Sequence, residues 1–331
     1  MNLCTLFDSR YLLRALAMYG SLFRAEKHFH LYILAMDDLA FSILTKLHLT
    51  NVTLIKLSSF EDDDLLQIKP SRTLGEYCWT CTPSLIHFCL KKLNLDQVTY
   101  VDADLYFVNS PAVLLDELQE KSILITEHRY TKKYDQSLYS GRFCVQFMTF
   151  KNTPSGFDCL QWWRDRCLEW CFNRHEDGKF GDQKYLDFWP EKFPQSHILN
   201  HLGGGLAPWN IQQYSISNLS PLELEEISSG VKFRPIFYHF HQFKILDHNF
   251  VDLGSYQIAQ SIVEGFYSPY LQEIFIWQNK IRTITGQNIE VYDLKIKNYG
   301  TFWRFRNFVK RYVGLSQTIS TNSYRLKIKR P

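Results

Sequence analysis

Short apolar runs alternate with segments of helical periodicity near the start of the chain, and this alternation is the feature that most constrains the fold. Residues 3–7, 31–36 and 52–55 are apolar runs of strand length, and residues 11–23 and 39–48 between them carry apolar side chains at helical spacing. The run at 31–36 is nearly continuous, as in a strand that is buried on both faces of a parallel sheet. The pattern therefore predicts an α/β protein with a Rossmann-like sheet.

Acidic residues follow several of these strands. Asp8 ends the first run, Asp37 follows the second, and a further apolar strand at 98–101 leads directly into Asp102 and Asp104. Ligand sites in open α/β sheets lie beyond the carboxyl ends of the strands. We therefore expect these carboxylates to share one edge of the sheet, and we expect the chemistry of the protein to take place there.

Two Thr-Pro pairs predict the starts of helices, because Thr can cap a helix and Pro suits its first position. Thr82-Pro83 precedes apolar residues at helical spacing, and Thr153-Pro154 opens a second such segment. Both helices are expected to pack on the sheet.

The composition is that of a folded globular protein. The 331 residues, 45% apolar and 21% charged, exclude wholesale disorder and allow one large domain or two modest ones. No run approaches the length of a transmembrane helix, and residues 2–8 lack the basic and apolar regions of a signal peptide. Eight cysteines without such a leader predict reduced thiols and a cytoplasmic protein.

Charge is divided unevenly along the chain. Residues 294–331 hold ten of the 37 Lys and Arg residues and none of the 34 Asp and Glu residues, so the rest of the chain carries a net charge of about −7. An acidic body excludes nucleic acid as an expected partner.

Basic and aromatic residues interleave at 299–312, which suits an anionic membrane surface and a peripheral contact with its inner face. The alternative is a solvated helix that packs its aromatic side chains on the body. We expect a catalytic domain at 1–254 and a helical, basic and aromatic extension at 255–331.

The Asp102-x-Asp104 pair is the strongest chemical signal. In extended chain, residues i and i+2 project to the same side, so both carboxylates point into one crevice. Such a pair is favourable when a divalent cation lies beside it, and oxygen ligands favour Mg²⁺ or Mn²⁺, which would bridge a diphosphate. A solvated acidic turn is the alternative, but the apolar residues on both sides of the pair favour a buried edge of the sheet.

Two further clusters could face a ligand. Asp182 and Gln183 follow Gly181 at the start of an expected helix, where they would either cap the helix or meet a sugar. His239 and His241 share one face of an expected strand, and Lys244 follows them, which fits a metal ligand beside a phosphate-binding cation. The spacing leaves the choice between the two histidines open.

Together these residues resemble the GT-A glycosyltransferases, in particular the retaining nucleotide-sugar transferases of the glycogenin and bacterial lipopolysaccharide galactosyltransferase type. The resemblance covers residues 1–250, and it implies a Rossmann-like GT-A fold with a mixed central sheet and Mn²⁺ or Mg²⁺ as cofactor. It implies that Thr5, Asp8 and Tyr11 bind the nucleotide base and that Asp102, Ala103 and Asp104 bind the metal and the donor. It also implies that Asp182 binds hydroxyl groups of the donor sugar and that Gln183 lies at the β face of the reacting carbon. His239, with His241 as the alternative, would be the third metal ligand, and Lys244 would bind the phosphate of the donor.

The sequence departs from this family in two places. The N-x-G of the strand after the D-x-D is replaced by Cys144 and Gln146. The late histidine motif lacks the Gly before Lys244 and the Pro-Trp after it. The first departure alters the expected donor-sugar pocket.

The resemblance implies transfer of a sugar from a nucleotide donor, with UDP expected, to a glycan, glycolipid or protein, with retention at the anomeric carbon. Surface polysaccharide or lipopolysaccharide biosynthesis is the expected setting. A phosphatase of the haloacid-dehalogenase type also carries D-x-D at a strand end and a later G-D, here Gly181-Asp182. A nucleotide- or sugar-binding protein without catalysis is the other alternative.

Overall fold

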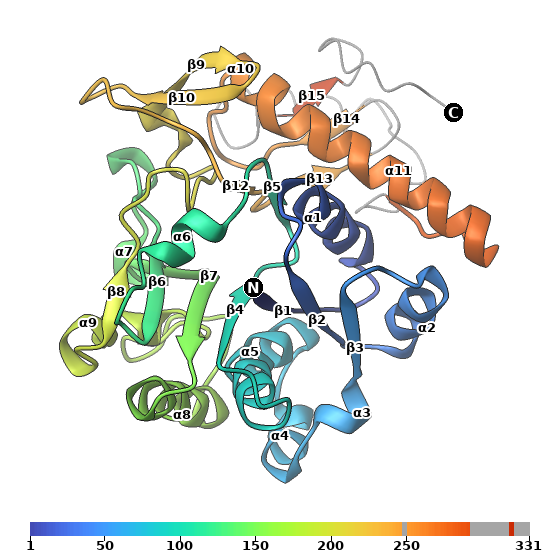
Figure 1. Cartoon of the computed structure of the whole chain (residues 1–331), viewed down its shortest axis with the longest axis vertical. Coiled ribbons are helices and arrows are strands. Elements are labelled where there is room, and N and C mark those ends of the chain that lie inside the picture. Colours follow the sequence, from blue (N-terminus) through green and yellow to red (C-terminus); the bar gives the residue numbers. More distant parts are fainter. Residues whose placement is uncertain (247–249, 292–317, 321–331) are drawn as a thin grey trace.

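A mixed sheet lies at the centre of the molecule. The computed structural model describes residues 1–246, 250–291 and 318–320 (Figure 1). Its main sheet has seven strands in the order β3-β2-β1-β4-β7-β6-β8. These are β1 (Asn2–Phe7), β2 (His30–Ala35), β3 (Val52–Lys56), β4 (Gln97–Val101), β6 (Ile123–Glu127), β7 (Phe143–Lys151) and β8 (Ser196–Ile198).

The sheet has a parallel half and an antiparallel half. β3, β2, β1 and β4 are parallel to one another, whereas β7 runs antiparallel to both β4 and β6. β8 returns parallel to β6. The predicted α/β fold with a mixed central sheet is therefore confirmed, and the expected strands at 3–7, 31–36 and 52–55 are β1, β2 and β3.

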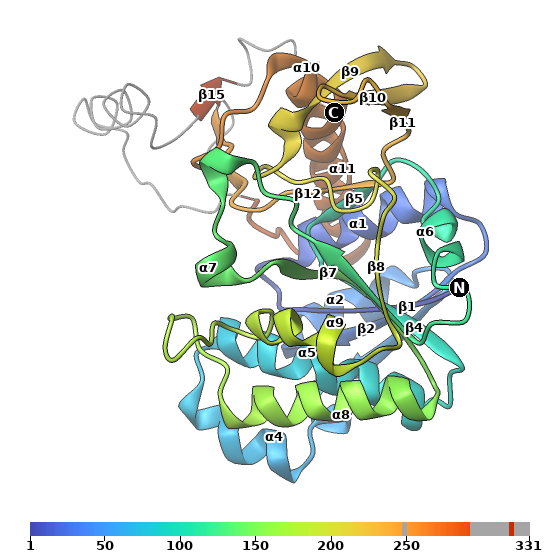
Figure 2. The ribbon, with the colours of Figure 1, turned by 90° about the vertical axis from the view of Figure 1, so that its left-hand side faces the viewer.

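Helices cover both faces of the sheet (Figure 2). One face carries α1 (Leu12–Ala25), α2 (Asp38–Leu47) and α11 (Ser268–Thr285), whose buried residues share one apolar core. The other face carries α5 (Leu74–Lys91) and α8 (Pro154–Glu169), whose buried residues form a second core. The two cores account for the apolar runs in the sequence, because the central strands are covered on both faces.

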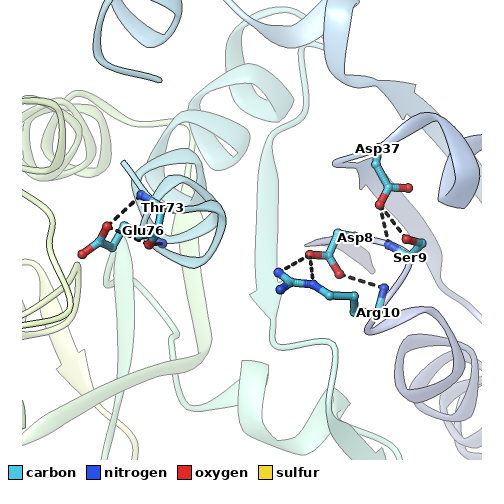
Figure 3. Close-up of polar contacts among 6 residues, drawn as sticks. All are labelled: Asp8, Ser9, Arg10, Asp37, Thr73 and Glu76. Carbon is cyan, nitrogen blue, oxygen red and sulfur yellow. Dashed lines mark hydrogen bonds and ion pairs between the residues drawn. The ribbon is translucent and has the colours of Figure 1, made fainter. Parts of the chain in front are cut away.

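Helix α5 begins earlier than the Thr82-Pro83 pair predicts. The Glu76 amide donates to Thr73 Oγ1 (3.4 Å) and the Glu76 carboxylate accepts from the Thr73 amide (2.8 Å), which forms a capping box (Figure 3). Pro83 lies inside the helix, where it removes one main-chain hydrogen bond. The start of α8 at Pro154 is as predicted.

Short elements complete the described chain. β5 (Leu105–Phe107) pairs with β12 (Phe237–His239), and this pairing joins the end of the D-x-D segment to the late histidine motif. The others are α3 (Leu57–Phe60), α4 (Asp63–Ile68), α6 (Ala112–Asp116), α7 (Ser137–Ser140), α9 (Trp189–Lys192), α10 (Gln260–Ile262), β9 (Tyr214–Leu219), β10 (Leu222–Glu226), β11 (Lys232–Phe233), β13 (Lys244–Ile245), β14 (Phe250–Asp252), β15 (Thr318–Ser320), the 3₁₀ helices Lys69–Ser71, Lys132–Tyr134, Lys184–Phe188 and Ile211–Gln213, and the π-helical Val263–Tyr267.

The C-terminal part of the described chain is helical, as expected. α11 packs along α1, where Arg24 forms an ion pair with Glu273 (2.8 Å) and the rings of Tyr19 and Trp277 meet edge to face. The basic tail at 294–331 lies outside the described residues except for the backbone of β15, and the domain boundary after residue 254 stays a prediction. No helix in the described ranges is long and apolar enough to cross a membrane.

Candidate active site

A cavity of about 540 Å³ opens at the edge of the sheet where β1 and β4 end and β7 begins. Most of the residues that the sequence assigned to the donor and the metal line this cavity. The predicted residues in its wall are Asp8, Tyr11, Asp102, Ala103, Asp104, Asp182, Gln183, His239 and His241.

Three of these side chains form a group that can hold a metal ion. The ligand atoms of Asp102, Asp104 and His239 all lie within 4.8 Å of one another. His239 Nε2 is 3.2 Å from Asp104 Oδ1 and 3.8 Å from Asp102 Oδ2. The pairing of Leu105 in β5 with His239 in β12 brings the histidine beside the D-x-D turn. Of the two histidines that the sequence left open, His239 belongs to this group, whereas His241 lines the cavity nearby.

Burial and mutual charge control the ionisation of the group. Burial raises the pKa of Asp102 to about 6. Burial also disfavours the charged form of Asp104, but the adjacent His239 outweighs it and holds the pKa of Asp104 below its usual value. In His239 itself, burial favours the neutral ring, yet Asp104 and its hydrogen bond raise the pKa well above the ordinary value. Without a cation, the two carboxylates therefore retain a proton on the imidazole.

The donor set fits a divalent cation. Two carboxylates and one imidazole converge at the cavity wall, and cation binding would displace the proton that the carboxylates hold on His239. Asp102, Asp104 and His239 are therefore the residues that could hold a metal in the described part of the chain.

Asp182 and Gln183 reach the cavity from the segment after α8. Burial, with the charge of Asp102, raises the pKa of Asp182 to about 8. Gln183 Nε2 donates to the Ser140 carbonyl in α7 (2.7 Å), so the amide oxygen is the end that can face a ligand. The expected helix cap is not formed by Asp182, because the 3₁₀ helix Lys184–Phe188 starts after Gln183 without a side-chain cap.

The end of β1 forms the other side of the cavity (Figure 3). Asp8 is 3% exposed and accepts hydrogen bonds from the Arg10 amide (2.9 Å) and from Arg10 Nε (2.9 Å). Asp37 lies at the same edge but has a different role: it accepts from Ser9 and caps α2 through the Ala40 amide (2.7 Å). Arg10 was not singled out from the sequence, although it lies three residues beyond the end of β1.

Two of the assigned residues do not line the cavity. Thr5 is fully buried in β1, and its hydroxyl has no hydrogen-bond partner within the described ranges. Lys244 is exposed in β13. Arg10 is the one lysine or arginine that the described chain places in the cavity wall.

The structure adds a wall that the sequence did not reveal. His128 stacks on Tyr130 with ring centroids 4.5 Å apart, and Trp209 meets His128 edge to face at 5.1 Å and His241 at 5.3 Å. Burial lowers the pKa of His128 to about 3, so this ring is neutral. His128 and Tyr130 come from the segment after β6, whereas Trp209 follows β8 and His241 follows β12, so no local spacing in the sequence could join the three segments.

Fold and site thus define a mixed α/β protein with an Asp-Asp-His group in a cavity at the edge of its central sheet. No family model matches the sequence. The chain is 33% identical over 254 residues to the uncharacterized protein YfnF of Bacillus subtilis (strain 168), a match that covers 74% of this chain and 82% of YfnF. It is 29% identical over 287 residues to the uncharacterized protein YfnD of the same strain, covering 84% and 90%. The chain belongs to the family of YfnF.

Several solved structures of glycosyltransferases are similar to this chain at low sequence identity. The galactosyltransferase LgtC has a TM-score of 0.48 at 12% identity, covering 73% of this chain and 87% of LgtC. The bifunctional glycosyltransferase WbbM has a TM-score of 0.49 at 13% identity, covering 87% and 52%. The glycosyltransferase GlyE of Streptococcus pneumoniae TIGR4 has a TM-score of 0.46 at 17% identity, covering 84% and 63%.

Proposed function

We propose that the protein is a metal-dependent glycosyltransferase that moves a hexosyl group from a nucleoside diphosphate, with UDP as the expected carrier, to a hydroxyl group of a glycan, glycolipid or protein. The observation that carries the proposal is the convergence of Asp102, Asp104 and His239 in a cavity that Asp182 and Gln183 also line. A phosphate-bridging cation and a sugar-facing amide are the two components that such a transfer needs.

Mn²⁺ suits the group better than Mg²⁺, because Mg²⁺ prefers a shell made of oxygen ligands and His239 contributes a nitrogen. When bound, the cation would neutralise the charge that develops on the departing diphosphate.

In the proposed reaction, the bond between the anomeric carbon and the phosphate oxygen breaks, and an acceptor hydroxyl forms the new glycosidic bond. The proton of that hydroxyl ends on the departing diphosphate. The oxygen of the Gln183 amide would stabilise the positive charge that develops on the sugar, because Ser140 holds the nitrogen end. An amide is a poor nucleophile, so attack from the face of the departing group, with retention, is proposed rather than a covalent adduct. Asp182 would bind donor-sugar hydroxyls.

The nucleotide would lie at the end of β1. Asp8 presents a buried carboxylate there, Tyr11 presents a ring that is 45% exposed, and Arg10 adds a positive charge. A carboxylate that accepts hydrogen bonds and a ring that can stack are suited to a base, and the guanidinium is suited to a phosphate.

The acceptor is proposed to belong to a surface polysaccharide or lipopolysaccharide. Residues 294–331, largely outside the described chain, would then bring the protein to the anionic inner face of the membrane. Sedimentation with anionic liposomes, with and without these residues, tests this. Equal binding of the two proteins would reject the anchor.

Thermal unfolding with UDP, GDP, CMP or ADP, each in Mn²⁺ and in EDTA, tests the main proposal. A ligand at 100 times its Kd stabilises a protein by about 2.7 kcal/mol. We expect one nucleoside diphosphate to stabilise the protein in Mn²⁺ but not in EDTA. We expect this stabilisation to be absent in the Asp104→Asn variant. Asp158→Asn, which changes an exposed carboxylate in α8, is the matched control.

Other outcomes discriminate the alternatives. Phosphate release from small phosphoesters, abolished by Asp102→Asn, would favour the phosphatase. Nucleotide binding without transfer or slow hydrolysis of any donor would favour a binding protein. NMR of the first-formed product tests the stereochemistry, and an inverted anomer would contradict the proposed course.

A further inference from the structure

Gln146 contacts both segments that carry the candidate metal ligands. It lies in β7 and is fully buried, behind the cavity wall. Its side-chain Oε1 lies 2.9 Å from His239 Nδ1, and its main-chain carbonyl accepts from the Asp102 amide (3.0 Å). A single residue of the sheet therefore touches the D-x-D turn with its backbone and the histidine of β12 with its side chain.

An irregularity in β7 aims this side chain. The pairing of β6 with β7 shifts register between Leu124 and Thr126, so that residues 145–148 of β7 lie opposite Ile125 alone. Thr126 Oγ1 donates to the Phe147 carbonyl (2.8 Å) within this stretch. Bulges of this kind redirect side chains beside active sites. Here the redirected side chain is an amide that reaches His239.

A glycine closes the space around the amide. Gly205 has a φ of +90°, and a Cβ atom at this position would lie 2.7 Å from Thr126 Cγ2 and 3.5 Å from Gln146 Nε2. The loop after β8 therefore packs directly over the amide of Gln146 and confines it.

The contact determines which nitrogen of His239 carries a proton. The amide oxygen of Gln146 can only accept, so His239 Nδ1 must donate, and this leaves Nε2 as the nitrogen that faces Asp102 and Asp104. A histidine binds metal through the nitrogen without a proton, and the partner of its other nitrogen sets ring orientation and tautomer. We propose that Gln146 is the positioning residue that presents His239 Nε2 to the cation, an inference that rests on the proposed metal site.

This role gives a physical account of one departure from the GT-A pattern. Where the resembled family has the Gly of N-x-G, this chain has Gln146, and a glycine has no side chain with which to hold a histidine. The residue acts through His239 rather than on the donor sugar, because it lies behind the cavity wall and Cys144 and Val145 line the cavity instead.

The orientation of the Gln146 amide determines whether His239 can bind a cation. Gln146 Nε2 is buried without a hydrogen-bond partner in the described chain. If the amide were turned over, Nε2 would donate to His239 Nδ1 and the ring proton would move to the nitrogen that faces the carboxylates. That arrangement could not bind a cation. A carboxylate in place of the amide would only accept a hydrogen bond, and a thioether would accept weakly and donate nothing.

Mn²⁺ titration of the full-length protein, with free Mn²⁺ followed by EPR, tests the proposal. Gln146→Met keeps the size of the side chain but replaces the amide oxygen with a sulfur that accepts only weakly, and we expect it to weaken Mn²⁺ binding by about 10–100-fold. Gln146→Glu retains the acceptor and should stay within about threefold of the unaltered protein or bind more tightly. Thr149→Val is the control: Thr149 lies in the same strand as Gln146, its buried hydroxyl is hydrogen-bonded to Thr99 of β4, and the variant should bind Mn²⁺ normally.

Equal affinity in Gln146→Met and the unaltered protein would overturn the inference, as would equal losses in Gln146→Met and Thr149→Val, because those would indicate a merely structural effect. If the unaltered protein bound no Mn²⁺, the metal site itself would fail, which separates the two hypotheses. Should Gln146→Met not fold, ¹⁵N NMR of the histidine rings in the Mg²⁺-saturated protein, assigned with His239→Gln, decides the matter. A proton on Nδ1 supports the positioning role, and a proton on Nε2 overturns it.

Discussion

The two halves of the central sheet contribute to the cavity in different ways. In the parallel half, three of the four strands lead into an acid: Asp8 follows β1, Asp37 follows β2 and Asp102 follows β4. Asp8 and Asp37 both bond to residues close in sequence or at the next strand end. In the antiparallel half, Gln146 of β7 meets His239 of β12, a strand outside the main sheet and far away in the chain. The difference teaches that parallel strands bring side chains together because their carboxyl ends meet at one edge of the sheet. In the antiparallel half, the register of the strands and a bulge in β7 determine which side chains meet.

The largest expected effect lies where the two halves meet. Asp104→Asn removes the negative charge and replaces one of the two carboxylate oxygens with an amide nitrogen, so it should weaken Mn²⁺ binding by more than the roughly 10–100-fold that loss of an outer partner costs. Titration by EPR measures this, and donor turnover should fall with it. If Asp104→Asn bound Mn²⁺ as tightly as the control Asp158→Asn, the cation would bind at another site.

A substitution in the parallel half should weaken nucleotide binding without weakening metal binding. Asp8→Ala removes a buried carboxylate from the cavity, so we expect nucleoside diphosphate affinity to fall about 10-fold while Mn²⁺ affinity is unchanged. Calorimetry with each ligand measures both. Asp37→Asn, at the neighbouring strand end but outside the cavity wall, is the control. Similar losses in both variants would mean that the whole edge acts as one unit.

The antiparallel half should be sensitive to backbone strain. Gly205→Ala places a methyl group at a φ of +90° and close to Thr126, so the free energy of unfolding should fall by about 2 kcal/mol. Urea unfolding measures it. Gly230→Ala has a φ of +72° but open space around the added atom, and it isolates the backbone contribution. Equal losses would argue that packing over Gln146 contributes nothing.

Loss of a helix cap should lower the free energy of unfolding by a smaller amount. Thr73→Ala removes the capping box of α5 and should cost about 1 kcal/mol of the free energy of unfolding, without change in Mn²⁺ affinity. Thr45→Ala, an exposed hydroxyl inside α2, is the matched control and should be close to neutral. A loss of metal binding in Thr73→Ala would show that α5 shapes the site more than its distance along the chain suggests.

The smallest effect should come from acid titration at the end of β2. Burial by itself raises the pKa of Asp37, but hydrogen bonds from the Ala40 and Ser9 amides and the Ser9 hydroxyl outweigh it and lower the pKa below its usual value. Its contribution is therefore present above the unfolded pKa of about 3.9 and is lost as pH falls through the folded value. Asp37→Asn should lower the free energy of unfolding by ~0.5 kcal/mol at pH 7 and by less near pH 3. A difference that grows in acid would contradict this.

Much of the parallel half could be predicted from the sequence. The strands that became β1, β2 and β3, the helices between them and the acids at their ends follow from local periodicity, and the D-x-D pair follows from a two-residue spacing. The start of α5 was placed at Thr82-Pro83 because a Pro usually ends or begins a helix, yet the capping box at Thr73 begins it earlier.

The sequence by itself determined the class of the sheet, the carboxylates at its edge and a short set of candidate ligands. Only the tertiary structure decided that His239 rather than His241 joins Asp102 and Asp104, because β5 and β12 pair across more than a hundred residues of chain. It also decided that Gln146 reaches that histidine, since the register of β6 against β7 is a long-range property. Local spacing reports which residues share a face, but contact between faces depends on strands that meet only in the folded chain.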